Sequence, residues 1–164
     1  MLRRVLQTTL IGASLAASPL VASSALAQGA SPLAQLTGSW RGSGTVRFEG
    51  GQSERLSCRG YYTAKDGGTG LGLALRCASS SGKIELRSLL HYKAGRVTGS
   101  WEERSFNASG GVSGRASSGT MSVAISGGGF SGVMSISVSG SRQSVSINTS
   151  GTGFKGVSIS LKRG

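Results

Sequence analysis

The chain has 164 residues, enough for one domain with a sizeable core, and a formal net charge of +12. Its single histidine excludes a multi-histidine metal site, and its two cysteines allow one disulfide at most. All six acidic residues precede residue 104, so the rest of the chain carries positive charge only.

The N-terminal segment has the features of a secretory signal peptide. Arg3 and Arg4 supply its positive end, residues 5–26 carry no charge, and Ala25-Leu26-Ala27 is a small-x-small cleavage pattern. A transmembrane anchor is the rival interpretation, but polar residues and a proline interrupt the apolar run that it needs. We therefore expect a signal peptide over 1–27 and a periplasmic or secreted mature chain. That chain has 16 basic and six acidic residues, a net charge of +10.

Residues 28–36 are expected to form an N-terminal segment with a short helical turn. Ser31 suits the cap of that turn, and Pro32 suits its first position. Thr37-Gly38-Ser39-Trp40 then opens the first strand, in which Trp40 and every second residue after it face inward.

A turn at Glu49–Ser53 is expected to join the first two strands. A five-residue loop there pairs Gly42 with Gly60 on the inner face, where paired glycines allow a sheet to bend and close. On the outer face, the same pairing sets Arg47 against Arg55.

The next hairpin carries both cysteines. Gly67-Gly68 is a strong hairpin signal, and a two-residue loop there sets Cys58 directly opposite Cys77. Such a loop makes them a hydrogen-bonded pair with Cα atoms about 5.5 Å apart, a separation that still fits a disulfide. An exported protein meets an oxidising environment, so we expect Cys58 and Cys77 to be linked.

Segments of alternating polarity continue to the end of the chain at spacings near ten to twelve residues. In the second half, serines occupy the polar positions, for example between Met134, Ile136 and Val138. Even spacing with tight turns is typical of an antiparallel meander, and closure removes its exposed edges. The predicted fold is all-β, a closed barrel of eight to ten strands with one disulfide, forming a single domain over 37–164.

The outer face of the first half carries a lateral series of charges. The predicted pairing sets Arg59 against Arg76, Arg76 against Glu85, and Glu85 against Arg104. Two arginines that face each other repel, which favours an anionic partner. The candidate anion-binding surface comprises Arg47, Arg55, Arg59, Arg76 and Arg104. Ordinary solubilisation of a basic barrel is the alternative.

No catalytic motif survives inspection, and we predict no enzyme, no cofactor and no metal. His91 faces outward beside Thr98, and no G-x-S-x-G turn supplies a nucleophile. Glu102 and Glu103 are adjacent on a strand and face opposite sides, so they do not form a carboxylate pair for glycoside hydrolysis. Nucleic acid is disfavoured, because most aromatic residues fall on the inner face. A transmembrane barrel is also disfavoured, because it needs aromatic girdles at both interfaces.

Two resemblances add expectations. The Gly38-Ser39-Trp40 opening after a helical turn resembles the calycin barrels, lipocalins and avidins among them. That resemblance implies a basic residue of the last strand, Lys162 or Arg163, packed against Trp40. The Thr-Gly-x-Trp opening, the two cysteines and Gly99-Ser100-Trp101-Glu102 resemble small exported proteins of alphaproteobacteria, a family that brings no assigned activity.

Two functions from different classes remain. The first is an envelope protein whose basic surface binds an anionic lipid or polysaccharide. The alternative is a calycin-like barrel that holds a small apolar or amphipathic ligand near Trp40, Tyr62 and Trp101. The sequence contains nothing that fixes the oligomeric state.

Overall fold

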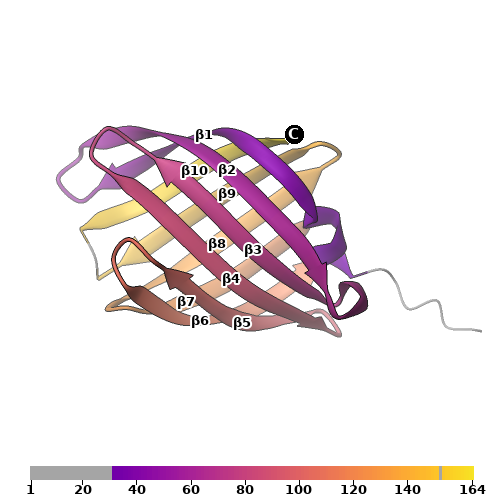
Figure 1. The fold of residues 1–164 in the computed structure, drawn as a ribbon. Coiled ribbons are helices and arrows are strands. Elements are labelled where there is room, and N and C mark those ends of the chain that lie inside the picture. The colour runs from indigo at the N-terminus through magenta and orange to yellow at the C-terminus, as the bar shows by residue number, and fades with distance from the viewer. Residues whose placement is uncertain (1–30, 152) are drawn as a thin grey trace, which may run out of the picture.

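The computed structural model describes residues 31–151 and 153–164, which form a closed antiparallel β-barrel (Figure 1). A 3-10 helix, η1 (Pro32–Leu36), precedes the barrel, and a short one, η2 (Asp66–Gly68), lies in its second hairpin. The ten strands are β1 (Gly38–Phe48), β2 (Ser53–Lys65), β3 (Gly70–Ala78), β4 (Lys83–Lys93), β5 (Arg96–Glu103), β6 (Ala108–Ser117), β7 (Thr120–Gly127), β8 (Phe130–Ser139), β9 (Arg142–Ser150) and β10 (Phe154–Arg163). The predicted signal peptide lies outside the described residues.

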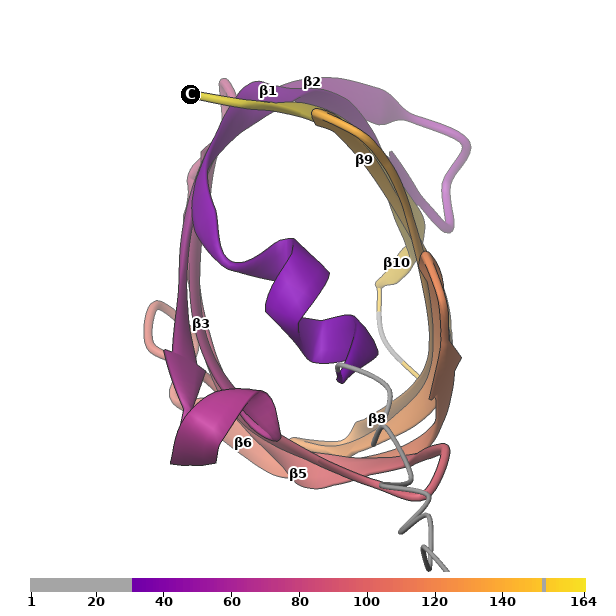
Figure 2. The ribbon, with the colours of Figure 1, turned by 90° about the vertical axis from the view of Figure 1, so that its right-hand side faces the viewer.

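The barrel is a simple meander. Each strand pairs with the next along the chain, and β1 closes the ring by pairing with β10 (Figure 2). The barrel therefore has ten strands, which confirms the upper limit of the predicted range of eight to ten. No helix in the described residues has the length and hydropathy needed to cross a membrane.

The disulfide joins Cys58 on β2 to Cys77 on β3, as predicted. The turn is longer than expected, because Asp66 to Thr69 form a four-residue loop in which Thr69 N donates to the Asp66 carbonyl over 3.3 Å. The change leaves the register intact, since residues are added equally on both sides of Gly67-Gly68. The two Cα atoms lie 4.1 Å apart, which corresponds to the narrow, non-hydrogen-bonded type of pair rather than to the wide type that we expected.

Removing this disulfide is expected to lower the free energy of unfolding by about 2 to 3 kcal/mol, because the unfolded chain regains the freedom of the closed loop. The check is urea unfolding of the Cys58→Ala/Cys77→Ala variant beside the oxidised protein. Equal stability of the two proteins would contradict this expectation, and mass spectrometry of the oxidised protein should show the linked peptides.

The register between β1 and β2 differs from the predicted one by two residues. Gly42 faces Cys58 rather than Gly60, and Trp40 faces Gly60. The cause lies in the turn, where Phe48 N donates to the Gln52 carbonyl over 2.9 Å and closes the loop one residue earlier on each strand. A shift of two keeps every side chain on its predicted face.

Helix η1 lies across one end of the barrel (Figure 2). Ser31 caps it by accepting a hydrogen bond from Leu33 N, and its two leucines, Leu33 and Leu36, are buried. Trp40 is fully buried beneath it and donates through Nε1 to the Leu36 carbonyl over 2.7 Å. Arg163 packs over the Trp40 ring at 4.4 Å, so the basic residue that the calycin resemblance implies at this position is present.

Candidate functional site

Five basic residues lie side by side across five neighbouring strands of the outer face. The strand pairing places Arg142 opposite Lys162, Lys162 opposite Arg41, Arg41 opposite Arg59, and Arg59 opposite Arg76. All five side chains are exposed. We call this set, from β9 through β10, β1 and β2 to β3, the basic row. Neighbouring strands are about 4.8 Å apart, so it extends over about 19 Å.

The basic row is electrostatically unfavourable in the isolated protein. Its one ion pair in the described part of the chain joins Arg76 Nε to Glu85 Oε1 over 3.8 Å, with the arginine side chain 65% exposed. Like charges directly opposite each other cost a few tenths of a kcal/mol per pair. An anion that bridges neighbouring guanidinium groups relieves this repulsion, because each planar fork matches a carboxylate or phosphate.

The predicted anion-binding residues do not all lie together. Arg59 and Arg76 face each other as expected, whereas Arg47 faces Ser53 and Gly156. Arg55 faces Thr45, so the predicted pairing of Arg47 with Arg55 is wrong, for the reason given above for the β1–β2 turn. Arg104 lies in the turn after β5, and its backbone N–H donates to the Glu85 carbonyl over 3.1 Å.

The sequence prediction missed three members of the basic row. The predicted register has Arg41 on the outer face, but its two-residue error sets Arg41 opposite Tyr61 instead of Arg59. Lys162 and Arg142 join the row through the pairings of β10 with β1 and β9. No turn joins β1 to β10, so the sequence gives no local signal for the register that sets Lys162 opposite Arg41.

The three aromatic residues proposed to hold an interior ligand do not form one site. Trp40 and Tyr62 lie together near η1, with ring centroids 6.4 Å apart. Trp101 lies near the C-terminal end of β5, away from η1, and its Nε1 donates to the Ser126 carbonyl over 3.3 Å. All three are buried, and none of them lines either of two pockets in the described part of the chain, a large one on the outer face and a small one beneath η1.

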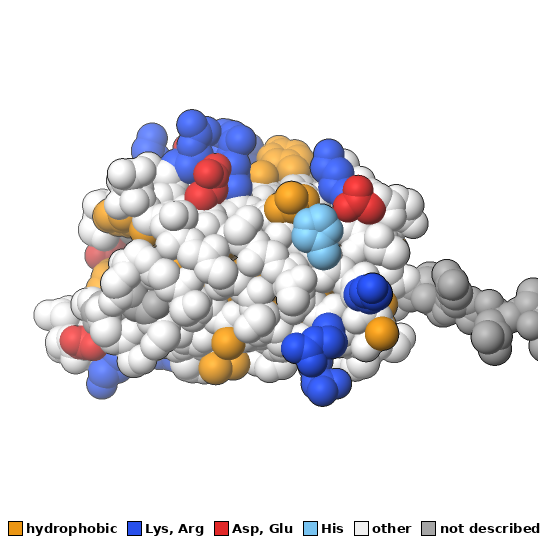
Figure 3. All heavy atoms as spheres, turned by 90° about the horizontal axis from the view of Figure 1, so that it is seen from below, with side chains coloured by type: hydrophobic (Ala, Val, Ile, Leu, Met, Phe, Trp, Pro, Cys, Tyr) orange, Lys and Arg blue, Asp and Glu red, His pale blue; other side chains and the backbone are white. Residues whose placement is uncertain are grey.

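The larger of these two pockets is an open groove of about 960 Å³ on the outer face, over β6 to β10 and β1. Serine and threonine side chains supply most of its polar groups. Viewed from below, the face that carries the single histidine shows its basic side chains in separate clusters, with a few acidic and hydrophobic side chains among uncharged polar ones (Figure 3). The smaller pocket lies beneath η1, between Leu36 and the ends of β6 to β8.

Glu103, Asp66 and the single histidine contact other groups of the barrel. Glu103 is buried, and its two carboxylate oxygens accept hydrogen bonds from the backbone N–H groups of Glu85 and Phe106 over 2.7 and 2.6 Å. His91 faces Thr98 on the outside, as predicted, with Nδ1 3.5 Å from Asp66 Oδ2. No group of three histidine, cysteine or acidic side chains suited to a metal occurs in the described ranges.

Comparison with known proteins finds structures with a similar fold but identifies no family. No protein-family model and no curated protein matches the chain. Among solved structures, Rv2717c from M. tuberculosis is similar with a TM-score of 0.66 and 17% identity, over 82% of this chain and 94% of that one. The S-type phycobiliprotein lyase CPES from Guillardia theta is similar with a TM-score of 0.56 and 16% identity, over 79% and 89%. At these identities the likeness shows the barrel fold alone.

Tyr62 should make the barrel sensitive to alkaline pH. Burial raises the pKa of Tyr62 to about 12, a rise that the neighbouring Gln143 amide opposes. Gln143 is buried and has no hydrogen bond of regular geometry in the described structure, so the contact between the two groups is a loose one. The unfolded chain releases the phenol proton at about pH 10, whereas the folded chain keeps it. Stability is therefore full below pH 10 and falls by roughly 2 kcal/mol between pH 10 and 12.

The measurement is urea unfolding at pH 9 and pH 11.5, for the native protein and the Tyr62→Phe variant. Other groups also titrate at high pH, so the expected result is a smaller loss of stability in the variant. Equal losses would show that the Tyr62 phenol is not held protonated by folding.

Proposed function

We propose that this protein is an exported, non-enzymatic binding protein whose basic row engages a polyanion of the cell envelope. Successive anionic groups of the polymer would bind along the basic row, to Arg142, Lys162, Arg41, Arg59 and Arg76. The anionic groups can be phosphates or carboxylates, because both match the guanidinium fork.

One observation carries this proposal: five exposed cations stand directly opposite one another on neighbouring strands. A barrel that needed positive charge for solubility alone would gain as much from cations that are dispersed over its surface. Export is supported by the N-terminal sequence and by the disulfide, which is typical of oxidising compartments.

Co-sedimentation with vesicles tests the proposal. Vesicles with anionic headgroups and polyphosphate-coated beads should retain the protein at low salt, and neutral vesicles and uncoated beads should not. Binding should fall steeply as salt rises from 0.05 to 1 M, where the screening length shrinks to about 3 Å. Equal recovery on charged and neutral supports would leave the charge as a solubilising feature and overturn the proposal.

The alternative, an interior site for a small apolar ligand, has less support. The three proposed aromatic contacts are buried and do not lie together, and the interior is filled by fully buried side chains, Trp40, Leu71, Leu90 and Val97. The relevant check is native mass spectrometry of freshly purified protein, in which a retained small molecule would favour this alternative.

A further inference from the structure

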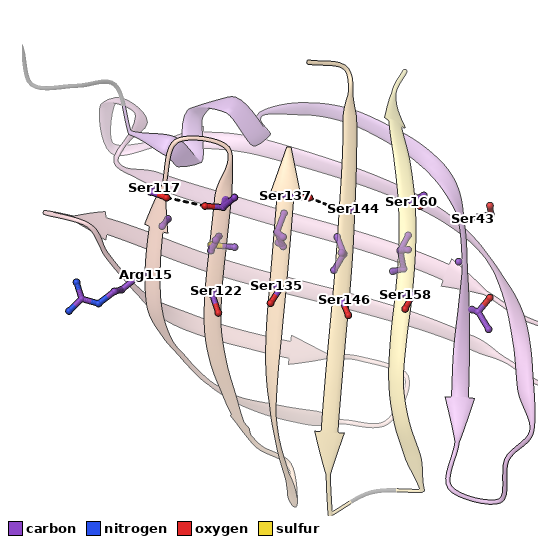
Figure 4. A pocket seen from close by; sticks show the side chains of 18 of the residues that line it. Ser43, Arg115, Ser117, Ser122, Ser135, Ser137, Ser144, Ser146, Ser158 and Ser160 are labelled. Atoms are coloured by element: carbon purple, nitrogen blue, oxygen red, sulfur yellow. Dashed lines mark hydrogen bonds between the residues drawn. The ribbon is translucent and has the colours of Figure 1, made fainter. Parts of the chain in front are cut away.

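The groove on the outer face is lined by two parallel rows of hydroxyl groups. In the first row, Ser122, Ser135, Ser146 and Ser158 stand opposite one another on β7 to β10 (Figure 4). In the second row, Ser137, Ser144, Ser160 and Ser43 do the same on β8, β9, β10 and β1. Hydroxyls recur about every 4.8 Å across the strands, and the two rows are about 7 Å apart along them. We call this surface the hydroxyl groove.

Many of these hydroxyls are available to a ligand. Ser137 and Ser144 bond to each other over 2.6 Å, whereas Ser122, Ser135 and Ser146 form no side-chain hydrogen bond with the described part of the chain. Each serine hydroxyl both donates and accepts. The groove thus offers a regular set of donors and acceptors to a molecule with the same dual groups.

Positive charge borders the hydroxyl groove along one side and at one end. The second hydroxyl row lies two residues along the strands from the basic row, because Ser144, Ser160 and Ser43 follow or precede Arg142, Lys162 and Arg41 on the same strands. At the β6 edge, Arg115 lines the groove and faces Arg96 on β5. No acidic residue occurs after Glu103 in the sequence, so β6 to β10 carry no negative side chain.

We infer that the hydroxyl groove binds an extended segment of an acidic, carboxylate-bearing polysaccharide. Sugar hydroxyls pair with the serine rows, while carboxylates of the same chain reach the basic row along one side and Arg115 at the β6 end. A groove that crosses six strands spans about 24 Å, long enough for several sugar rings. A headgroup layer is flat and does not enter such a groove. This inference rests on the proposed polyanion binding and names the polyanion.

The test compares four probes: oligogalacturonate, its neutral methyl ester, polyphosphate and anionic vesicles. Oligogalacturonate should bind at least tenfold more tightly than the ester. The Ser135→Ala/Ser146→Ala variant should weaken oligogalacturonate binding about tenfold and leave polyphosphate and vesicle binding within twofold. The matched control, Ser113→Ala/Ser126→Ala, removes two exposed hydroxyls outside the groove and should change nothing. Ser135→Glu places a carboxylate in the groove and should abolish oligogalacturonate binding.

The outcomes separate the two proposals. If polyphosphate binds and loses affinity in the Arg41→Gln/Arg59→Gln variant, but the serine variant binds oligogalacturonate normally, the polysaccharide inference is overturned and polyanion binding stands. Stronger retention by vesicles than by oligogalacturonate, unaffected by Ser135→Glu, would assign the surface to lipid. If none of the anionic probes binds, both proposals fail. Circular dichroism verifies that each variant is folded.

Discussion

Replacing Arg41, Arg59 and Arg76 together with glutamine is expected to weaken binding to polyanions about 30-fold at low salt. These residues are three successive members of the basic row, on β1, β2 and β3. An exposed charge pair contributes up to about 1 kcal/mol, so three such losses give roughly 2 kcal/mol, or about 30-fold in affinity. The dependence of the affinity on salt concentration should become shallower in the same variant.

The matched control removes the same charge elsewhere. Lys83, Arg87 and Arg104 belong to β4 and the turn after β5, outside the basic row. Changing these three to glutamine lowers the net charge equally, and we expect less than a threefold loss of affinity. Equal losses in the two triple variants would mean that net charge, rather than the row, determines binding.

The folded state should respond to the row variant in the opposite direction. Arg59 has a cation directly opposite it on each side, so Arg59→Gln removes two repulsive neighbours. The free energy of unfolding should rise by about 0.5 kcal/mol while binding weakens, which chemical denaturation measures. Lower stability in Arg59→Gln would show that the guanidinium supports the fold and would weaken the functional interpretation.

The face of each side chain was predictable from the sequence, whereas its lateral neighbours were predictable only in part. Alternation has a period of two, so the predicted β1–β2 pairing placed Trp40 inside and Arg41 outside even though it was wrong by two residues. The Cys58–Cys77 pairing was correct because an added turn residue on each strand leaves the pairing unchanged. The basic row depends on lateral neighbours, which are set by turn geometry and by closure of β1 on β10.

The groove was harder to foresee for the same reason. The serine alternation of the second half was evident in the sequence, but the hydroxyl rows exist only if the three turns between β7 and β10 keep the strands in step and β10 pairs with β1 in the right register. Tight turns such as Gly128-Gly129 and Gly140-Ser141 do this, since each leaves two residues between paired strand ends. The sequence signals these turns individually, and their combined effect appears only in the closed barrel.

The close packing of neighbouring strands should depend on inward glycines, and Gly110→Ala is expected to destabilise the barrel severely. A Cβ atom at Gly110 would lie 1.8 Å from the Ser126 carbonyl oxygen and 2.8 Å from the Gly127 Cα. Both atoms belong to the backbone of β7, so the clash cannot be relieved by a side-chain rotation. The same Ser126 carbonyl accepts the Trp101 indole hydrogen bond, so moving it also disturbs the barrel interior. We expect a loss of about 4 kcal/mol, at the severe end for a point substitution.

Gly111→Ala is the matched control, one residue along the same strand. A Cβ there meets nothing within 4 Å and points outward, so we expect a change of less than about 0.5 kcal/mol. Denaturant unfolding of the two variants beside the native protein measures the difference. If Gly110→Ala were as stable as Gly111→Ala, the strands β6 and β7 would have to be further apart than the structure places them.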